Sequence, residues 1–340
     1  MVKLPVSKLD DLFAAVAAQS ELYLPSDNAA GQAEYRRWER GVKLSGALNT
    51  VRSAKDFFFP QTENIADFKV EGKKIEVIDN RREADDFVVF GVRACDVASF
   101  AILDRVFLSE PVDSFYKTRR EHGLVISLAC SKPETTCFCP LFGIDATNPG
   151  GDIASWIVNA EIYFEAVSEK GKSFLESFKA LFSKADAKAV EAQKKATAEI
   201  LAKLPLAAVK TEKFKAENLN RLFDSPEWAK LSQACLGCGT CTFVCPTCQC
   251  YDIRDYDAGG CVKRFRCWDS CMYSDFTKMA HGNPRLTQVE RFRQRFMHKL
   301  VYYPANNDGI YGCVGCGRCV GKCPVSMNIV KVMKTLGDKR

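Results

Sequence analysis

The sequence is short of the residues from which hydrolytic active sites are built. It has only three histidines, His122, His281 and His298, and they are scattered along the chain. No Ser/His/Asp or Cys/His arrangement is evident, and neither a Walker loop nor a G-x-G-x-x-G turn after a predicted strand occurs. These absences argue against a conventional hydrolytic metal site and against a dinucleotide site in this chain.

Long apolar runs and a strong net charge are missing as well. No apolar run approaches the roughly 20 residues of a membrane span. The first residues, MVKLPVSKLDDLF, turn acidic too early for a secretory signal. The net charge of +6 is mild and indicates no nucleic-acid partner by itself. We therefore expect a cytoplasmic protein with no membrane span and no nucleic-acid partner.

Cysteine, in contrast, is abundant, and its distribution divides the chain. Thirteen of the seventeen cysteines follow residue 226, where they are set among glycines and Cys-Pro pairs. An odd number in a chain of this length does not suit a disulfide framework, and in a reducing cytosol such spacing indicates metal binding or redox chemistry. We predict an α/β domain over residues 1–225 and a ferredoxin-like domain over residues 226–340.

Two cysteine runs in the C-terminal part share the spacing C-x2-C-x2-C-x3-C-P, at residues 235–246 and 313–324. In bacterial ferredoxins this run binds two [4Fe–4S] clusters, and the fourth cysteine of each run serves the other cluster. Three thiolates must converge on one cube, and glycines beside them let backbone amides approach the sulfurs. Zinc is the alternative, but structural zinc usually takes two separated pairs of ligands.

This crossed pattern assigns every cysteine of the two runs. The first predicted [4Fe–4S] cluster is bound by Cys235, Cys238, Cys241 and Cys323. The second is bound by Cys313, Cys316, Cys319 and Cys245. Five more cysteines of this domain are not assigned to either cluster, and two alternatives are open for them: ligands of another metal, or small buried side chains. They are Cys248, Cys250, Cys261, Cys267 and Cys271.

The segment between the two runs is basic, and we predict a helical insertion over residues 251–310. Residues 261–300 hold nine Lys and Arg against three acids, which equals the whole net charge. Val289, Phe292 and Phe296 follow a helical spacing with arginines between them. We expect a basic amphipathic helix that packs over the cluster core, or that docks a partner or tunes the reduction potentials.

The N-terminal part alternates predicted helices and strands, so the fold class is α+β. Apolar residues predict a first helix from about residue 9, and strands are predicted at residues 74–79, 87–92 and 124–129. A helix lies between the last two, with Asp96 as its expected cap. Strand, helix and strand in this order indicate a partly parallel sheet. A hairpin is expected near residues 156–167, and two surface helices are expected after it.

The four cysteines outside the ferredoxin-like domain are predicted to meet at one edge of that sheet. Cys95 and Cys130 each follow a predicted strand, and ligands collect at the carboxyl edge of such sheets. Cys137 and Cys139 lie in the next loop, CSKPETTCFC. We predict that these four thiols bind a third iron–sulfur cluster of the [4Fe–4S] type. The alternatives are buried cysteines without a ligand, or zinc.

Several blocks together resemble one family across nearly the whole chain, among them GVRACDVASFAILDRVF, CSKPETTCFC, CPTCQC, RCWDSC and CVGCGRCVGKCP. This iron–sulfur subunit family, with its 4Fe-4S dicluster domain, includes the iron–sulfur subunit of anaerobic sulfite reductase and the beta subunit of cytosolic NAD(P)-linked sulfhydrogenases.

The resemblance implies a role in a cytosolic multi-subunit oxidoreductase of anaerobic metabolism. The chain would relay single electrons between a partner subunit that binds FAD and NAD(P)H and a terminal catalytic subunit of sulfite reductase or hydrogenase type. FAD and NAD(P) are then expected on the partner, and no catalytic residue is expected here. The alternative is a self-contained reductase with a substrate site in the N-terminal α/β domain.

Overall fold

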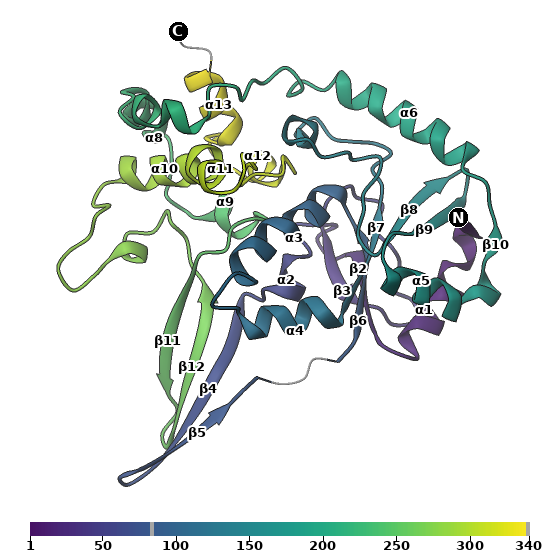
Figure 1. Ribbon diagram of the computed structural model, residues 1–340, viewed down its shortest axis with the longest axis horizontal. Coiled ribbons are helices and arrows are strands. Elements are labelled where there is room, and N and C mark those ends of the chain that lie inside the picture. The colour runs from purple at the N-terminus through teal and green to yellow at the C-terminus, as the bar shows by residue number, and fades with distance from the viewer. Residues whose placement is uncertain (82–84, 338–340) are drawn as a thin grey trace.

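The computed structural model describes residues 1–81 and 85–337, and it holds two β-sheets with helices packed around them (Figure 1). The strands of the larger sheet are β1 (Val2–Pro5), β2 (Glu21–Asp27), β3 (Ala33–Arg37), β6 (Phe87–Val92), β7 (Gly123–Leu128), β8 (Ile153–Val158), β9 (Glu161–Ala166) and β10 (Ser183–Lys184). Their spatial order is β10-β1-β9-β8-β7-β6-β2-β3. The neighbours β2, β6, β7 and β8 run parallel, and the outer pairs are antiparallel. The predicted partly parallel sheet is confirmed.

The central strands are buried on both faces, as parallel strands usually are. Val88 and Phe90 of β6 pack with the first helix on one face, and Val89 packs with the second, third and fourth helices on the other. These helices and the two that follow are α1 (Leu9–Ala17), α2 (Lys55–Phe58), α3 (Ala94–Phe107), α4 (Ser114–His122), α5 (Glu169–Ser177) and α6 (Lys188–Ala202). Cys95 follows β6 and Cys130 follows β7, and both pack in one cluster with Cys316, so the carboxyl ends of these strands face the cysteine-rich part of the chain.

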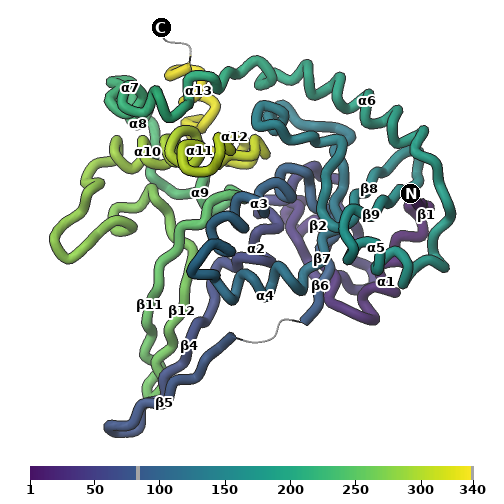
Figure 2. The backbone as a smooth tube through the Cα atoms, viewed as in Figure 1, coloured from purple at the N-terminus to yellow at the C-terminus, as the bar shows by residue number. Residues whose placement is uncertain are grey.

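The second sheet projects from the body of the molecule as an arm (Figures 1 and 2). Its strands are β4 (Thr62–Glu71), β5 (Lys74–Asp79), β11 (Tyr251–Asp257) and β12 (Cys261–Trp268), all antiparallel, in the order β11-β12-β4-β5. The helical prediction for residues 251–310 is therefore wrong for its first part. Gly259 and Gly260, with φ of 74° and 102°, close a hairpin there, and a helix cannot pass through such a turn.

A buried ion-pair network anchors this arm to the larger sheet. Arg266 of β12 donates from Nε to Glu63 Oε2 at 2.7 Å and also pairs with Asp113, at the start of α4. Part of the basic charge of the insertion is thus neutralised inside the protein. The boundary between residues 225 and 226 stays a prediction, and the second sheet draws strands from both sides of it.

Short helices make up most of the cysteine-rich part. They are α7 (Leu219–Phe223), α8 (Glu227–Ser232), α9 (Thr240–Phe243), α10 (Gln288–Met297), a π-helical turn (His298–Tyr302), α11 (Tyr303–Asn306), α12 (Arg318–Gly321) and α13 (Ile329–Gly337). Along the described residues, short 3-10 turns also occur at Val6–Lys8, Cys139–Phe142, Lys179–Leu181, Ala216–Asn218 and Asp275–Thr277. A common apolar core includes Trp228, Phe292 and Phe296. None of the described helices is long and apolar enough to cross a membrane.

Candidate metal centres

The first cysteine run brings three thiols close together around the start of α9. Cys235 lies close enough to Cys238 and Cys241 for their charges to act on it. Gly237 has a φ of 66°, and its N–H donates to Cys235 Sγ at 3.5 Å. Cys323 packs against the same apolar core as Cys235 and Cys241. The tight turn that the C-x2-C spacing predicts is therefore present, with an amide directed at a sulfur.

The second run repeats this geometry. Gly315 has a φ of 59°, and its N–H donates to Cys313 Sγ at 3.5 Å. The thiols of Cys313, Cys316 and Cys319 and that of Cys245 from the first run lie within electrostatic reach of one another. Burial raises the pKa of the Cys313 thiol to about 12. The structure thus brings together the four residues predicted for the second cluster, including the crossed ligand.

Buried cations from the basic insertion face both sets of thiols. Arg295 is 2% exposed, and its Nε donates to Cys241 Sγ at 2.9 Å. Lys299 is 4% exposed and donates from Nζ to Thr247 Oγ1, which lies 3.3 Å from Cys245 Sγ. The Nη1 atom of Arg295 is buried with no hydrogen-bond partner in the described part of the chain. A buried donor that lacks an acceptor beside thiols fits an anionic iron–sulfur cluster at this place.

Three of the five cysteines without a predicted role lie beside these cations. A hydrogen bond with Cys248 holds the pKa of Cys245 well below its usual value, against the effect of burial. Cys250 hydrogen-bonds in the same way with Cys271. The other two, Cys261 and Cys267, lie on β12 in the arm. Within residues 1–81 and 85–337, no three His, Cys, Asp or Glu side chains are grouped to hold a single metal ion.

A buried lysine that sequence analysis missed also belongs to this region. Lys55 of α2 is 1% exposed, and its Nζ donates to the carbonyl oxygen of Cys248 at 2.9 Å. The same ammonium lies 3.5 Å from the centre of the Trp268 ring. Burial lowers the pKa of Lys55 to about 8. The one available signal was a lysine placed directly before the aromatic run DFFF.

The four cysteines of the N-terminal part also come together. Cys95 lies in the first turn of α3, after β6, and Cys130 follows β7. Cys139 lies within electrostatic reach of Cys95, Cys130 and Cys137. Burial raises the pKa of the Cys137 thiol to about 11 and that of Cys95 well above its usual value. These thiols need a compensating cation, such as iron, to become thiolates there.

This third set lies directly against the second run. Cys316 acts electrostatically on Cys95, Cys137 and Cys139 alike. The N–H of Phe138 donates to the carbonyl oxygen of Gly315 at 3.0 Å. A Cβ atom on Gly315 would lie 2.5 Å from the carbonyl carbon and oxygen of Phe138, so only glycine permits this approach. The two ligand loops therefore pack backbone to backbone.

A buried ion pair joins the second run to α3, which carries Cys95. Arg318, which follows Cys316 by two residues, donates to both carboxylate oxygens of Asp96, at 2.5 and 2.7 Å. Asp96 is fully buried and lies next to Cys95. The prediction of Asp96 as a helix cap is wrong, because α3 begins at Ala94 and its N-cap position is Arg93. Asp96 instead balances the charge of Arg318.

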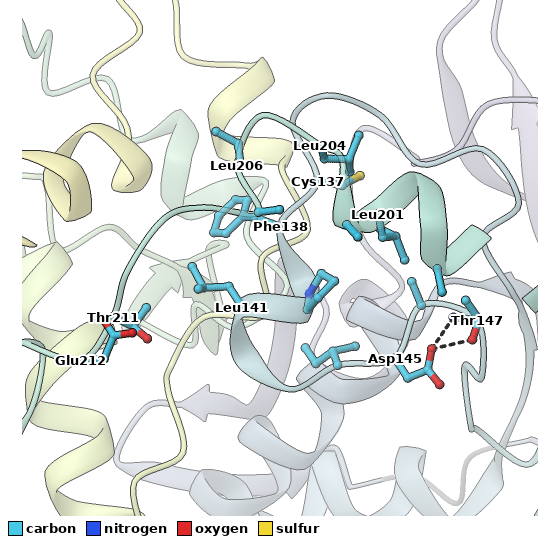
Figure 3. Close-up of a pocket in the computed structure, with 16 residues that line it drawn as sticks. Cys137, Phe138, Leu141, Asp145, Thr147, Leu201, Leu204, Leu206, Thr211 and Glu212 are labelled. Atoms are coloured by element: carbon cyan, nitrogen blue, oxygen red, sulfur yellow. Dashed lines mark hydrogen bonds between the residues drawn. The ribbon is translucent and has the colours of Figure 1, made fainter. Parts of the chain in front are cut away.

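A cavity of about 560 Å³ opens beside the third set (Figure 3). Cys137, Leu141, Leu201 and Leu204 are among its lining residues, which come from the 137–147 loop and from α6 and the segment after it. Asp145 lines it too, but its carboxylate accepts hydrogen bonds from Thr147 N and Oγ1, at 2.8 and 2.6 Å. The lining is thus mixed, with apolar side chains, the acids Asp145 and Glu212, and one thiol.

Repeated cysteine runs, amides directed at sulfur and buried cations beside thiols are the features of an iron–sulfur protein of electron transport. A family model described as a 4Fe-4S dicluster domain matches residues 234–327. The chain is also similar to sulfhydrogenase 2 subunit beta of Pyrococcus furiosus, with 33% identity over 309 residues, which cover 84% of this chain and 82% of the relative. The chain therefore belongs to the family of iron–sulfur subunits that includes this protein. No solved structure matches it significantly.

Proposed function

We propose that this chain is the electron-relay subunit of a cytoplasmic multi-subunit oxidoreductase. The observation that carries the proposal is the packing of the second thiol set against the third, with Cys316 in one buried cluster with Cys95 and Cys139. A bound [4Fe–4S] cluster supplies one-electron transfer without a change in the protein's bonds. Neighbouring thiol sets suit transfer from one to the next.

The ligands proposed are those predicted from the two runs and from the N-terminal loop. The residues around them serve the relay by excluding water and by holding the sulfurs. Amides of Gly237 and Gly315 support the thiolate forms, and the ion pair of Arg318 with Asp96 keeps the second and third sets together. No residue of the chain is proposed to act on a substrate.

The partners are proposed from the family. The relative is described as a sulfhydrogenase subunit, which indicates that it works beside other chains. We propose that one partner binds FAD and NAD(P)H and that the other is the terminal catalytic subunit, of sulfite reductase or hydrogenase type. Neither a flavin nor a dinucleotide is assigned to this chain.

Iron content tests the relay directly. The full chain, reconstituted anaerobically, should bind about twelve irons, on the basis of three four-iron clusters. Changing Cys95 to Ala should remove about four of them and leave the spectra of the ferredoxin-like pair intact. Eight irons in the wild type, unchanged in Cys95→Ala, would remove the third cluster. Bound zinc or four irons would overturn the assignment of the two runs.

A second candidate function is favoured by the cavity beside Cys137, which gives a small molecule access to one thiol of the third set. In that case the chain would be a reductase by itself, with its substrate site in the N-terminal part. An assay of NAD(P)H-linked dye reduction by the isolated chain, and by the chain with its co-purifying partners, separates the two functions. Turnover by the isolated chain, with a flavin spectrum, supports the self-contained reductase.

A further inference from the structure

The helix that carries the arginines of the insertion turns one of them inward. α10 carries Arg291, Arg293 and Arg295, the arginines that lie among the apolar residues of the predicted helix. Arg293 lies over the Phe223 ring at 3.6 Å and donates to the carbonyl oxygen of that residue at 3.3 Å. Arg295 lies among thiols instead and is 2% exposed. One charge of this helix is thus removed from water, and its neighbour is not.

The guanidinium of Arg295 holds Cys241 at two atoms. Nε donates to the sulfur at 2.9 Å, and Nη2 donates to the backbone carbonyl oxygen of the same residue at 2.7 Å. Nη1 is buried and has no acceptor among the described residues. These contacts fix the orientation of the guanidinium group, because it cannot rotate away from the sulfur without losing both hydrogen bonds.

The charge of Arg295 is not cancelled by an acid. The groups that act on it most strongly are the thiols of Cys241, Cys248, Cys245 and Cys319, and it forms no ion pair with an acid of residues 1–81 and 85–337. Lys299, one turn further along, adds a second buried cation. Near the third thiol set, Asp96 neutralises Arg318, and the half-buried Arg93, which donates to the carbonyl oxygens of Leu128 and Ala129, acts on Cys130. Arg295 and Lys299 thus place two fully buried positive charges at the first two sets.

We propose that Arg295 sets the reduction potential of the iron–sulfur cluster that Cys241 helps to bind, by holding an uncancelled positive charge and a hydrogen bond against its sulfur. The inference rests on the ligand assignment of the proposed function. Reduction adds one negative charge, so a cation in a water-excluded site stabilises the reduced state and raises the potential. A hydrogen bond to the sulfur acts in the same direction, because it withdraws electron density.

The test is a redox titration of the purified full chain, followed by electron paramagnetic resonance. Arg295→Gln removes the charge, and we expect one midpoint potential to move downward while the other potentials move less. Arg293→Gln is the matched control, because it removes the same charge from the same helix outside the thiol region, and it should leave all potentials in place. Arg295→Lys keeps the charge but not the fork, so its downward shift should be smaller.

Iron and sulfide are counted in every sample, so that loss of a cluster is not mistaken for a shift in potential. A fully loaded Arg295→Gln chain with unchanged potentials overturns the inference, and so does an equal shift in Arg293→Gln. If Arg295→Gln fails to retain its iron, Arg295→Lys decides, and an unchanged potential in that variant overturns the inference as well. A wild-type chain without eight irons at the two runs would instead contradict the proposed function.

Discussion

The contact between the ligand loops of the second and third thiol sets can be broken by one methyl group. Gly315 has a φ of 59°, and a Cβ atom there would meet the carbonyl group of Phe138 at 2.5 Å and the nitrogen of Cys139 at 2.6 Å. Ordinary contacts of a Cβ atom lie at 3.4–4 Å. The atoms that it would meet belong to backbone, which cannot rotate away as a side chain can. In Gly315→Ala the 136–139 loop must therefore move outward.

The expected loss of stability has two parts. A left-handed conformation costs a residue with a Cβ roughly 1–2 kcal/mol. Overpacking of a close-packed contact costs a further ~1–3 kcal/mol. The hydrogen bond from Phe138 N to Gly315 O is part of this contact and is lost if the loops separate. We expect a decrease of about 2–5 kcal/mol in the free energy of unfolding, the sum of these two costs, with a larger effect on the third set than on the first.

The assay combines thermal unfolding with iron counting. Gly321→Ala is the control, because it lies in the same short helix as Arg318 and its Cβ would meet only the Thr136 methyl group, at 3.9 Å. We expect Gly315→Ala to unfold at a lower temperature and to hold fewer irons at the third set, with Gly321→Ala close to wild type. Equal behaviour of the two variants would refute the close packing of the ligand loops.

Two more predictions concern buried charges. Asp96→Asn leaves Arg318 buried without its carboxylate and should lower the free energy of unfolding, measured by chemical denaturation, by about 3–5 kcal/mol. The control Asp308→Asn breaks only the exposed pair with Arg105 and should lower it by less than about 1 kcal/mol. Similar losses in the two variants would contradict the role of Asp96. Burial lowers the pKa of His298 to about 4, so the unfolded chain binds the proton first, and stability should fall by up to about 3 kcal/mol as the pH drops from 6.5 to 4. His298→Gln should flatten this acid limb in unfolding curves measured against pH, and an unchanged slope would show that other groups cause it.

Regular patterns in the sequence were enough for strands β6 to β9 of the large sheet, whereas the ligand assignment of the cysteine sets stays a prediction. The strands at residues 87–92 and 124–129 and the helix between them are confirmed, because apolar periodicity and burial agree there. The hairpin near residues 156–167 is confirmed for the same reason. The arm was predicted only in part. The strand expected at residues 74–79 is confirmed as β5, but β11 and β12 were missed. These two strands are largely exposed, so they carry no alternation of buried and exposed residues that would distinguish them from a polar helix.

The roles of the charged residues could not be predicted, because they depend on contacts between distant parts of the chain. Asp96 and Arg318 are 222 positions apart, and their pairing arises only when the second run packs on the N-terminal loop. Likewise, Arg295 and Arg293 have the same sequence context, and only packing decides which of them reaches a thiol. A spacing motif indicates candidate ligands, since most of them are local. It says little about the cations that balance them.

The distribution of these cations bears on the order of the proposed relay. Three cations, Arg295, Lys299 and Lys55, are fully buried around the first two sets and their neighbour Cys248. The third set is next to the neutral pair of Arg318 and Asp96 and has one half-buried cation, Arg93, beside Cys130. If the clusters are alike, an added electron should rest at the first two sets in preference to the third, because a cation stabilises the extra negative charge. The third set would then be the higher-energy step, bordered by the cavity in Figure 3 and joined to the rest through Cys316. Such a step favours fast passage over storage of the electron, so we expect the third set to face a partner and the cation-rich pair to hold charge between turnovers.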